Sequence, residues 1–303
     1  MSAKTRAKVE TAASSLGYRP NVLASSLTTR RTKLIGLVSD NFHNPIFLEV
    51  FDLFTRSLQD RGLRPLLVNL SNTSEPEQSV QMLQQYSVDG VVLASSTLPP
   101  AFAEAFRKSD APIVHSFGRY TDAPQVHVVG IDNRQGGRLA AEALLAHGYR
   151  RIGFMGGPKS ATSTQDRAEG FLDALKDVPG VDVSVSYAEA YSFRAGRTEM
   201  ARLVDGGPAE AYFCGDDVLA IGAMSAIESA GLSVPGDIGL IGLNDMEMSG
   251  WENINLTTIF QPVEQIIKTS VELIVAMIED PDQAPKSRLF DCRLVERGTL
   301  RVV

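Results

Sequence analysis

The sequence predicts an α/β protein built from two Rossmann-like halves that follow a short, basic helical arm. The chain has 303 residues, which suits about two domains of about 150 residues each. From residue 34 onward, short apolar runs alternate with amphipathic helical patterns in two successive series, as in doubly wound folds. The composition, 44% hydrophobic and 21% charged, is that of an ordinary globular chain and excludes a disordered or low-complexity protein.

The first 33 residues form the basic arm. Their seven lysines and arginines are opposed only by Glu10, so the arm carries a net charge of +6, whereas the whole chain carries −7. Ser2 can cap a helix over 3–16, Gly17 suits its end, and a second short helix can begin at Pro20. The apolar stripe of the first helix is Val9, Ala12, Ala13 and Leu16. On charge alone, the arm either meets a polyanion such as nucleic acid or is a solvated basic tail.

The strands are predicted where Val, Ile and Leu gather in short runs, the pattern of parallel strands buried on both faces. In the first half these runs are 34–39, 65–70, 90–95, 112–116 and 126–131. In the second half they are 151–156, 183–187, 211–214, 238–243 and 256–260. Amphipathic helices lie between them, notably over 133–147 and over 45–61, whose apolar face comprises Ile46, Phe47, Val50, Phe51, Phe54 and Leu58.

Ligands of doubly wound sheets bind beyond the carboxyl ends of the strands, and a cleft between two such halves is a common pocket. The loops expected to contact a ligand are therefore 40–47, 95–98, 117–120, 156–167, 214–217 and 243–251. Gly156-Gly157-Pro158 can approach a phosphate, although a tight turn explains it better. The adjacent acids Asp216 and Asp217 allow a metal or acid–base site, or simply a cap for the helix that follows.

Signatures of catalysis are absent from the sequence. There is no Walker-type loop and no Gly-x-Ser-x-Gly elbow, and the four histidines and two cysteines lack metal-binding spacing. We therefore expect neither an enzyme nor a cofactor nor a bound metal. No apolar run is long enough to span a membrane, no secretory signal is evident, and two cysteines suit a reducing compartment, so a cytoplasmic protein is expected.

A series of short motifs resembles the LacI/GalR family of bacterial transcriptional repressors, in the right order along nearly the whole chain. In the arm these are Ser2-Ala-Lys-Thr-Arg-Ala-Lys-Val9, Leu16-Gly-Tyr-Arg-Pro-Asn21 and Leu23-Ala-Ser-Ser-Leu27. In the core they include Asn44-Pro-Ile-Phe47, Val88-Asp-Gly-Val-Val92, Asp166-Arg-Ala-Glu-Gly-Phe171, Asp217-Val-Leu-Ala-Ile-Gly-Ala223, Val234-Pro-Gly-Asp-Ile238 and Gly242-Leu-Asn-Asp245. Each motif alone is weak, but the ordered series is very specific.

The resemblance implies a fold and a domain organisation. Residues 1–32 would be a partial helix-turn-helix headpiece and a hinge helix, followed by a type I periplasmic-binding-protein-like core. The N-subdomain of the core is expected over 33–132 plus 262–290, and the C-subdomain over 133–261 plus 291–303.

The resemblance also implies a function. Members of the family are typically homodimers that bind operator DNA, with an affinity that a small molecule in the core cleft changes. We therefore expect an effector-responsive transcriptional repressor. The alternative is a cytoplasmic small-molecule-binding dimer without sequence-specific DNA binding.

Effector-binding residues can be carried over from the resemblance position by position. Arg167 matches an effector-binding arginine, with a surface ion pair as the alternative, and Asn244 stands where many relatives have aspartate. Ser96 and Phe117 lie in the same strand-end loops. The expected set is Asn44, Phe47, Ser95, Arg119, Arg167, Phe213, Asp216, Asn244, Trp251 and Gln261. Its polar and aromatic groups suit a saccharide first and a nucleobase second.

For the hinge helix, the resemblance implies binding in the minor groove. Leu27 would wedge into a base step, although packing on the core or on a partner chain is the alternative for this side chain. The expected DNA-binding residues are Asn21, Ala24, Ser25, Leu27, Arg30 and Arg31. Headpieces of the family have two further helices, including the recognition helix, before the segment with which this sequence opens. A misplaced start codon, a shortened gene or a protein that needs no base-specific contact would each explain this, and we favour the first.

Overall fold

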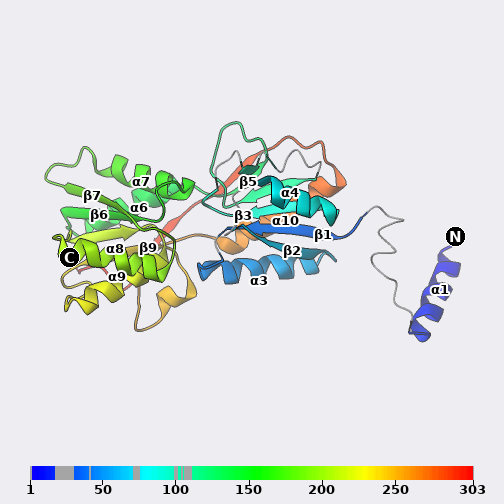
Figure 1. The fold of residues 1–303 in the computed structure, drawn as a ribbon, viewed down its shortest axis with the longest axis horizontal. Coiled ribbons are helices and arrows are strands. Elements are labelled where there is room, and N and C mark those ends of the chain that lie inside the picture. Colours follow the sequence, from blue (N-terminus) through cyan, green and yellow to red (C-terminus); the bar gives the residue numbers. More distant parts are fainter. Residues whose placement is uncertain are drawn as a thin grey trace.

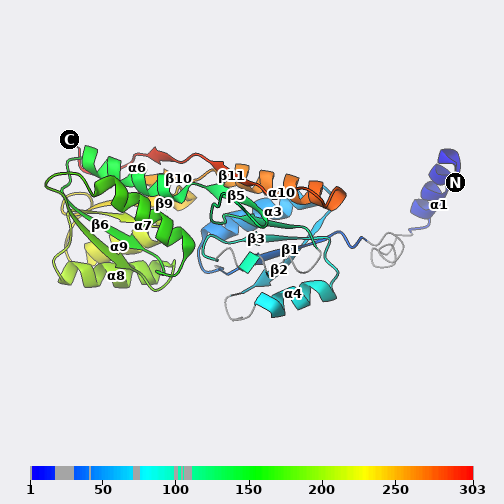
Figure 2. The ribbon, with the colours of Figure 1, turned by 90° about the horizontal axis from the view of Figure 1, so that it is seen from above.

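Two lobes of similar design lie along the long axis of the molecule, and helix α1 (Ala3–Ser15) stands apart from both (Figures 1 and 2). The computed structural model describes residues 2–17, 31–40, 42–70, 76–98, 102–103, 105 and 111–302. Each lobe contains a six-stranded sheet. We call the lobe that contains β1 the N-lobe and the lobe that contains β6 the C-lobe.

The N-lobe sheet has the strand order β11-β5-β4-β3-β1-β2, and its neighbouring strands pair in parallel. Helices α3 and α10 cover one face and α4 covers the other (Figure 2). Because both faces are covered, the central strands are apolar along their whole length. The strands are β1 (Leu34–Ser39), β2 (Arg64–Asn69), β3 (Gly90–Ala94), β4 (Ile113–Ser116), β5 (His127–Ile131) and β11 (Ser287–Phe290), and the helices are α3 (Ile46–Gln59), α4 (Pro76–Gln85) and α10 (Val263–Glu279).

The C-lobe sheet has the order β12-β10-β9-β8-β6-β7 and is parallel except for its edge strand β12, which runs antiparallel to β10. Helices α6 and α7 pack on one face, and α8 and α9 on the other (Figure 2). The strands are β6 (Arg151–Gly156), β7 (Asp182–Tyr187), β8 (Ala211–Cys214), β9 (Gly239–Asn244), β10 (Thr258–Phe260) and β12 (Arg293–Val295), and the helices are α6 (Asn133–Ala146), α7 (Thr162–Leu175), α8 (Phe193–Asp205), α9 (Asp217–Ser229) and the 3-10 turn η1 (Glu247–Gly250).

The C-lobe helices pack closely in pairs, with glycines at the points of contact. A Cβ atom at Gly137 of α6 would overlap the Arg167 carbonyl oxygen on α7, and one at Gly170 of α7 would overlap the Arg134 carbonyl oxygen on α6. Gly196 and Gly222 are placed in the same way between α8 and α9. Only glycine permits backbones to approach so closely, so each face of the C-lobe sheet is covered by a locked pair of helices.

The predicted α/β class is confirmed. Every strand predicted from the sequence is present, with ends displaced by at most two residues, and the two helices predicted over 45–61 and 133–147 correspond to α3 and α6. The sequence did not predict β11 and β12, because these edge strands are half-exposed and carry arginines instead of an apolar run. None of the helices in the described part of the chain is long and apolar enough to cross a bilayer.

The predicted first helix of the arm is also confirmed. Ser2 caps it by accepting the Thr5 amide at 3.3 Å, and Gly17 follows it with φ of +68°. Its predicted stripe is exposed in the described part of the chain, since the side chains of Val9 and Leu16 are 55% and 84% exposed. The short helix predicted from Pro20 lies outside the described residues.

Candidate functional site

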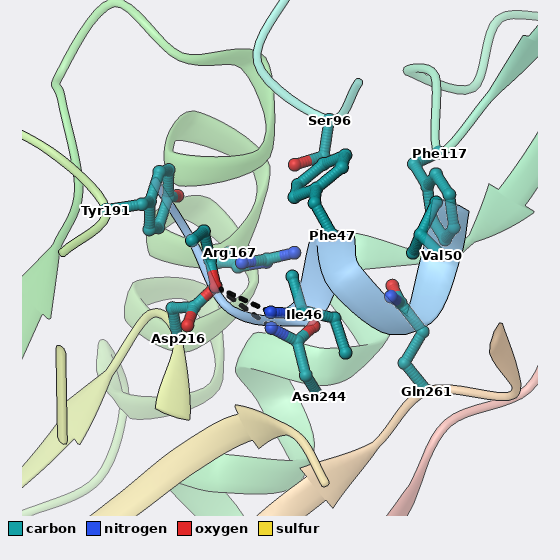
Figure 3. A pocket seen from close by; sticks show the side chains of 11 residues that line it. Ile46, Phe47, Val50, Ser96, Phe117, Arg167, Tyr191, Asp216, Asn244 and Gln261 are labelled. Carbon is teal, nitrogen blue, oxygen red and sulfur yellow. Dashed lines mark hydrogen bonds between the residues drawn. The ribbon is translucent and has the colours of Figure 1, made fainter. Parts of the chain in front are cut away.

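A buried cavity lies where the carboxyl ends of the strands of the two lobes face each other (Figure 3). The N-lobe contributes the start of α3 and the loops after β3 and β4, and the C-lobe contributes α7 and the loops after β7, β8 and β9. The lining residues are Asn44, Ile46, Phe47, Val50, Ser96, Phe117, Arg167, Tyr191, Asp216, Asn244 and Gln261. The cavity therefore occupies the inter-lobe position predicted for doubly wound sheets.

Asp216 is the polar centre of this cavity. Its Oδ2 accepts the side-chain amides of Asn44, from the N-lobe, and of Asn244, each at 2.9 Å. Its Oδ1 accepts the Val218 amide at 2.9 Å and so caps α9. Burial raises the pKa of Asp216, while the Val218 amide, the charge of Arg167 and the two side-chain amides act in the opposite direction. Asp216 can therefore cap α9 through Oδ1 while its Oδ2 stays available to groups in the cavity.

Arg167 lies next to Asp216 and is buried, not engaged in a surface ion pair. Its Nε donates to Asn133 Oδ1 at 2.8 Å, and its Nη1 donates to the Gly215 carbonyl at 2.5 Å. Both partners belong to the C-lobe, so the guanidinium is held in place without any ligand and points into the cavity (Figure 3). A fixed planar fork of donors is suited to hydroxyl or carboxylate oxygens.

A second buried acid supports the loop that carries Asn244. Asp217 accepts the Met246 amide and the Ser249 hydroxyl, each at 2.8 Å, and the Thr258 hydroxyl at 2.5 Å. Burial raises its pKa to about 7, and the hydrogen bonds from Thr258, Met246 and Ser249 only partly oppose this. Asp217 therefore connects α9, η1 and β10 behind the cavity and is not part of its wall.

The N-lobe supplies most of the apolar wall. Phe47 and Val50 come from α3, and Phe117 follows β4 with φ of +64°. Tyr191 closes the C-lobe side, with its hydroxyl 2.6 Å from Thr164 Oγ1. A ligand held by the polar centre would therefore lie between aromatic rings (Figure 3).

The lobes are closed on each other. The free volume of the cavity is about 20 Å³, which admits roughly one water molecule. Besides the Asn44–Asp216 bond, the Ser163 amide donates to the Ser96 carbonyl at 3.1 Å, and Arg119 of the N-lobe forms an ion pair with Asp166 of α7. A ligand larger than water must therefore separate the lobes or displace the amide–carboxylate contacts.

The predicted effector-binding residues fall into two groups. Asn44, Phe47, Arg167, Asp216, Asn244 and Gln261 all line the cavity. The structure places the other four elsewhere. Ser95 is buried and bonds Thr97, Arg119 pairs with Asp166, Phe213 packs on Phe154 and Phe171 in the C-lobe core, and Trp251 is 51% exposed beyond η1.

Some lining residues were not in the predicted set. Ser96 and Phe117 belong to strand-end loops that the sequence indicated, and Ile46 and Val50 extend the face that carries Phe47. Tyr191 follows the edge strand β7, and the loop after this strand was not among those expected to contact a ligand. The general rule that ligands meet the loops after strands would have included it.

The predicted DNA-binding residues are mostly not described. Asn21, Ala24, Ser25, Leu27 and Arg30 lie outside the described residues. Arg31 is exposed, and its Nη2 donates to the Ile278 carbonyl at the end of α10, at 2.6 Å. Among the described residues, no three His, Cys, Asp or Glu side chains form a group that could hold a metal ion.

The fold and the cleft define a class: two doubly wound lobes that close over a buried polar site are the architecture of periplasmic-binding-type sensor cores. The family model of the periplasmic binding protein-like domain matches residues 141–300, more than half of the chain.

Individual relatives narrow this class. The chain is 30% identical to the ribose operon repressor of Halalkalibacterium halodurans, over 94% of this chain and 85% of that protein. It is similar to a transcriptional regulator CelR–cellobiose complex (27% identity, TM-score 0.79) and to the Lac repressor dimer bound to operator and the anti-inducer ONPF (25%, TM-score 0.86), each over 99% of this chain and 91% of the other. The chain belongs to the LacI family of transcriptional regulators.

Proposed function

We propose that this protein is a homodimeric repressor of transcription whose affinity for operator DNA is set by a small polar effector bound between the lobes. The observation that supports this proposal best is the cluster of Asn44, Asp216 and Asn244 beside Arg167. This cluster connects the two lobes through the hydrogen bond between Asn44 and Asp216. Each of its side chains could replace a hydrogen bond within the cluster by one to a ligand. We also propose that residues 33–132 plus 262–290 form the N-subdomain and that residues 133–261 plus 291–303 form the C-subdomain.

The chemistry of the cavity favours a saccharide as effector. A sugar hydroxyl both donates and accepts, so it can insert between the Asp216 carboxylate, which only accepts, and the amides of Asn44 and Asn244. The rings of Phe47 and Tyr191 offer apolar faces to a pyranose or furanose ring. The cellobiose complex of the regulator similar to this chain supports the same class of ligand. A nucleoside, with a flat base and a ribose, is the second candidate.

The effector would act by changing the closure of the lobes. A ligand shifts a conformational equilibrium only by its difference in affinity for the two states. The Asn44–Asp216 bond exists only when the lobes are closed, so a ligand that replaces it changes the closed state directly. Coupling free energies of this kind are typically about 1–3 kcal/mol, or about 5- to 150-fold in operator affinity.

Binding is tested by thermal shift of the full chain, followed by calorimetry, with D-ribose, cellobiose, adenosine and cytidine as probes. We expect a saccharide to raise Tm and the variant Asp216→Leu to lose that response. The variant Asp52→Asn, which alters an exposed acid paired with Arg56 on α3, should keep it. A response that persists in Asp216→Leu would place the effector elsewhere.

Regulation is tested separately by selecting duplexes from a random-sequence pool with the full chain and measuring their affinity with and without the active probe. We expect the basic arm of this chain to select duplexes only weakly, and we expect the affinity for the selected duplexes to change with the probe. If the probe binds but no sequence is selected, this chain binds a small molecule without sequence-specific DNA binding. Sedimentation equilibrium on the same sample tests the dimer.

A further inference from the structure

A second hollow lies in the N-lobe at the amino ends of the strands, the opposite end from the effector cavity. It is bounded by the starts of β4 and β5, the end of α10 and the turn that follows this helix. We call it the α10 pocket, and its principal lining residues are Ile113, Val126, His127, Met277, Pro281 and Gln283. Its volume of about 210 Å³ is far more than a single bridging water fills.

His127 is the unusual residue of the α10 pocket. Its side chain is buried, yet neither Nδ1 nor Nε2 has a hydrogen-bond partner within the described part of the chain. A neutral imidazole carries one N–H donor and one acceptor. Leaving a buried polar group unpaired costs free energy, and most such groups in folded proteins have a partner. A ligand in the pocket would supply the missing one.

Two cations, Arg288 of β11 and Lys286 just before it, act on His127 electrostatically. In the parallel pairing of β5 with β11, Arg288 lies opposite Val129, and the Lys286 carbonyl accepts the Val128 amide at 3.0 Å. Paired residues of neighbouring strands point to the same face, so Arg288 lies on the face of the sheet that His127 also occupies. Burial lowers the pKa of His127, and the charges of Arg288 and Lys286 lower it further. The acids nearby, Glu279, Asp280 and Asp282, are exposed on the turn.

We propose that the α10 pocket binds a small organic acid whose carboxylate accepts the His127 N–H within the field of Lys286 and Arg288, and whose aliphatic part packs on Ile113, Val126 and Met277. The mainly apolar lining disfavours a fully hydrated ion, and the charges of Arg288 and Lys286 disfavour a cation next to His127. The site is separate from the effector cavity, so this inference does not depend on the proposed function.

Another hollow, formed by described residues and larger than the α10 pocket, differs from it in its charges. It lies at the mouth of the cleft and is lined by Arg119, Arg134 and Asp132, among others. Arg119 pairs with Asp166, Arg134 pairs with Glu169, and Asp132 caps α6. Its charges thus already have partners, whereas His127 in the α10 pocket has none.

An occupant of the α10 pocket would contact the end of α10, which also accepts a hydrogen bond from Arg31 of the basic arm. Arg31 donates to the carbonyl of Ile278, and the preceding residue, Met277, lines the pocket. A bound acid would therefore contact the helix end that holds Arg31.

The test is a long-range ¹H–¹⁵N correlation spectrum of the four histidine rings in the full chain, titrated with sodium butyrate at constant ionic strength. His127→Gln assigns the resonance. We expect a saturable shift of the His127 ring signals and a rise in its pKa, because a carboxylate stabilises the imidazolium. The signals of His147, which contacts the Arg301 carbonyl, should stay unchanged.

Arg288→Gln provides the matched variant, since the Arg288 side chain is exposed; circular dichroism checks that the variant is folded. We expect butyrate affinity to fall by up to about fivefold. An equal shift of the His127 signals by sodium chloride would show a non-specific anion effect and overturn the proposal. The absence of a saturable shift would mean that only water occupies the pocket, and an unchanged affinity in Arg288→Gln would contradict the cationic part of the site.

Discussion

The two lobes share one strand order, apart from the direction of the edge strand, but contribute different chemistry to the cleft. The C-lobe supplies Arg167 and Asp216, both buried and hydrogen-bonded within the lobe, and a second buried acid, Asp217, behind them. Its helices are locked in glycine-contact pairs. The N-lobe supplies chiefly apolar side chains from α3 and the loop after β4, together with the amide of Asn44.

This difference suggests a division between the lobes: the C-lobe holds the charged, hydrogen-bonding groups of the cavity, and the N-lobe supplies most of its apolar surface. Buried charges are stable only in a rigid shell that satisfies them, and the C-lobe is built as such a shell. Apolar contacts need no fixed partner, so under the proposed function the N-lobe would add them by closing over a ligand oriented by the C-lobe. The following predictions test whether rigidity and charge are indeed concentrated in one lobe.

The largest effect is expected from Arg167→Leu. The substitution leaves the Gly215 carbonyl and Asn133 without their donor and Asp216 without its neighbouring cation, so the free energy of unfolding should fall by about 3–5 kcal/mol. Urea denaturation followed by circular dichroism measures this. Arg134→Leu, which removes an exposed pair with Glu169, should cost less than about 1 kcal/mol. Similar losses in both variants would show that the buried network is not the stabilising feature of the C-lobe.

The next effect compares a glycine in each lobe. In Gly170→Ala the new Cβ would meet the backbone carbonyl of Arg134, which cannot move without separating α6 from α7. In Gly36→Ala the Cβ would lie 2.8 Å from a Leu83 side-chain carbon, which can rotate away. We expect a loss of about 3 kcal/mol for Gly170→Ala and about 1 kcal/mol for Gly36→Ala, read from Tm by calorimetry. Equal losses would mean that the C-lobe is no more tightly packed than the N-lobe.

A pH-dependent effect is expected from Asp217. Its folded pKa of about 7 lies above the ordinary value of 3.8, so between these values the folded protein keeps a proton that the unfolded chain has lost. This carboxyl group therefore makes stability fall as pH rises through that window, by at most about 1.4 kcal/mol per pH unit, and its contribution levels off above the folded pKa.

Asp217→Asn should flatten this slope when urea unfolding is measured from about pH 5 to pH 8. Asp237→Asn is the control, because the Ser233 hydroxyl and amide lower the pKa of that exposed acid, so its titration lies below the measured range. A slope that is the same in Asp217→Asn and in the parent protein would show that Asp217 titrates in the ordinary range when folded.

The sequence predicts those features of the fold and the cavity that depend on residues close together in the chain. The strands and α3 were predictable because their buried positions follow a regular period in the sequence. Asn44, Arg167 and Asp216 were expected in the cleft because they match family motifs, and the structure places all three in the cavity wall. Phe213 was expected in the cleft wall from the family resemblance, but its ring packs on Phe154 and Phe171 in the C-lobe core, a contact that no local pattern in the sequence indicates. The closure of the lobes, set by contacts between residues far apart in the chain, had no local signal.

The smallest effect is expected from Arg119→Gln. Arg119 and Asp166 join the lobes at the mouth of the cleft, and burial raises the pKa of Asp166 while Arg119 opposes that rise. Because the pair is partly solvated, its loss should change the free energy of unfolding by less than about 1 kcal/mol. The same substitution removes a contact that exists only in the closed state, so it should shift the lobes toward opening. Small-angle scattering should show a larger radius of gyration for Arg119→Gln than for Arg56→Gln, which breaks an ion pair within α3. If both variants scatter alike, closure depends on the Asn44–Asp216 contact and the loop around Ser96, and the charged mouth adds nothing to it.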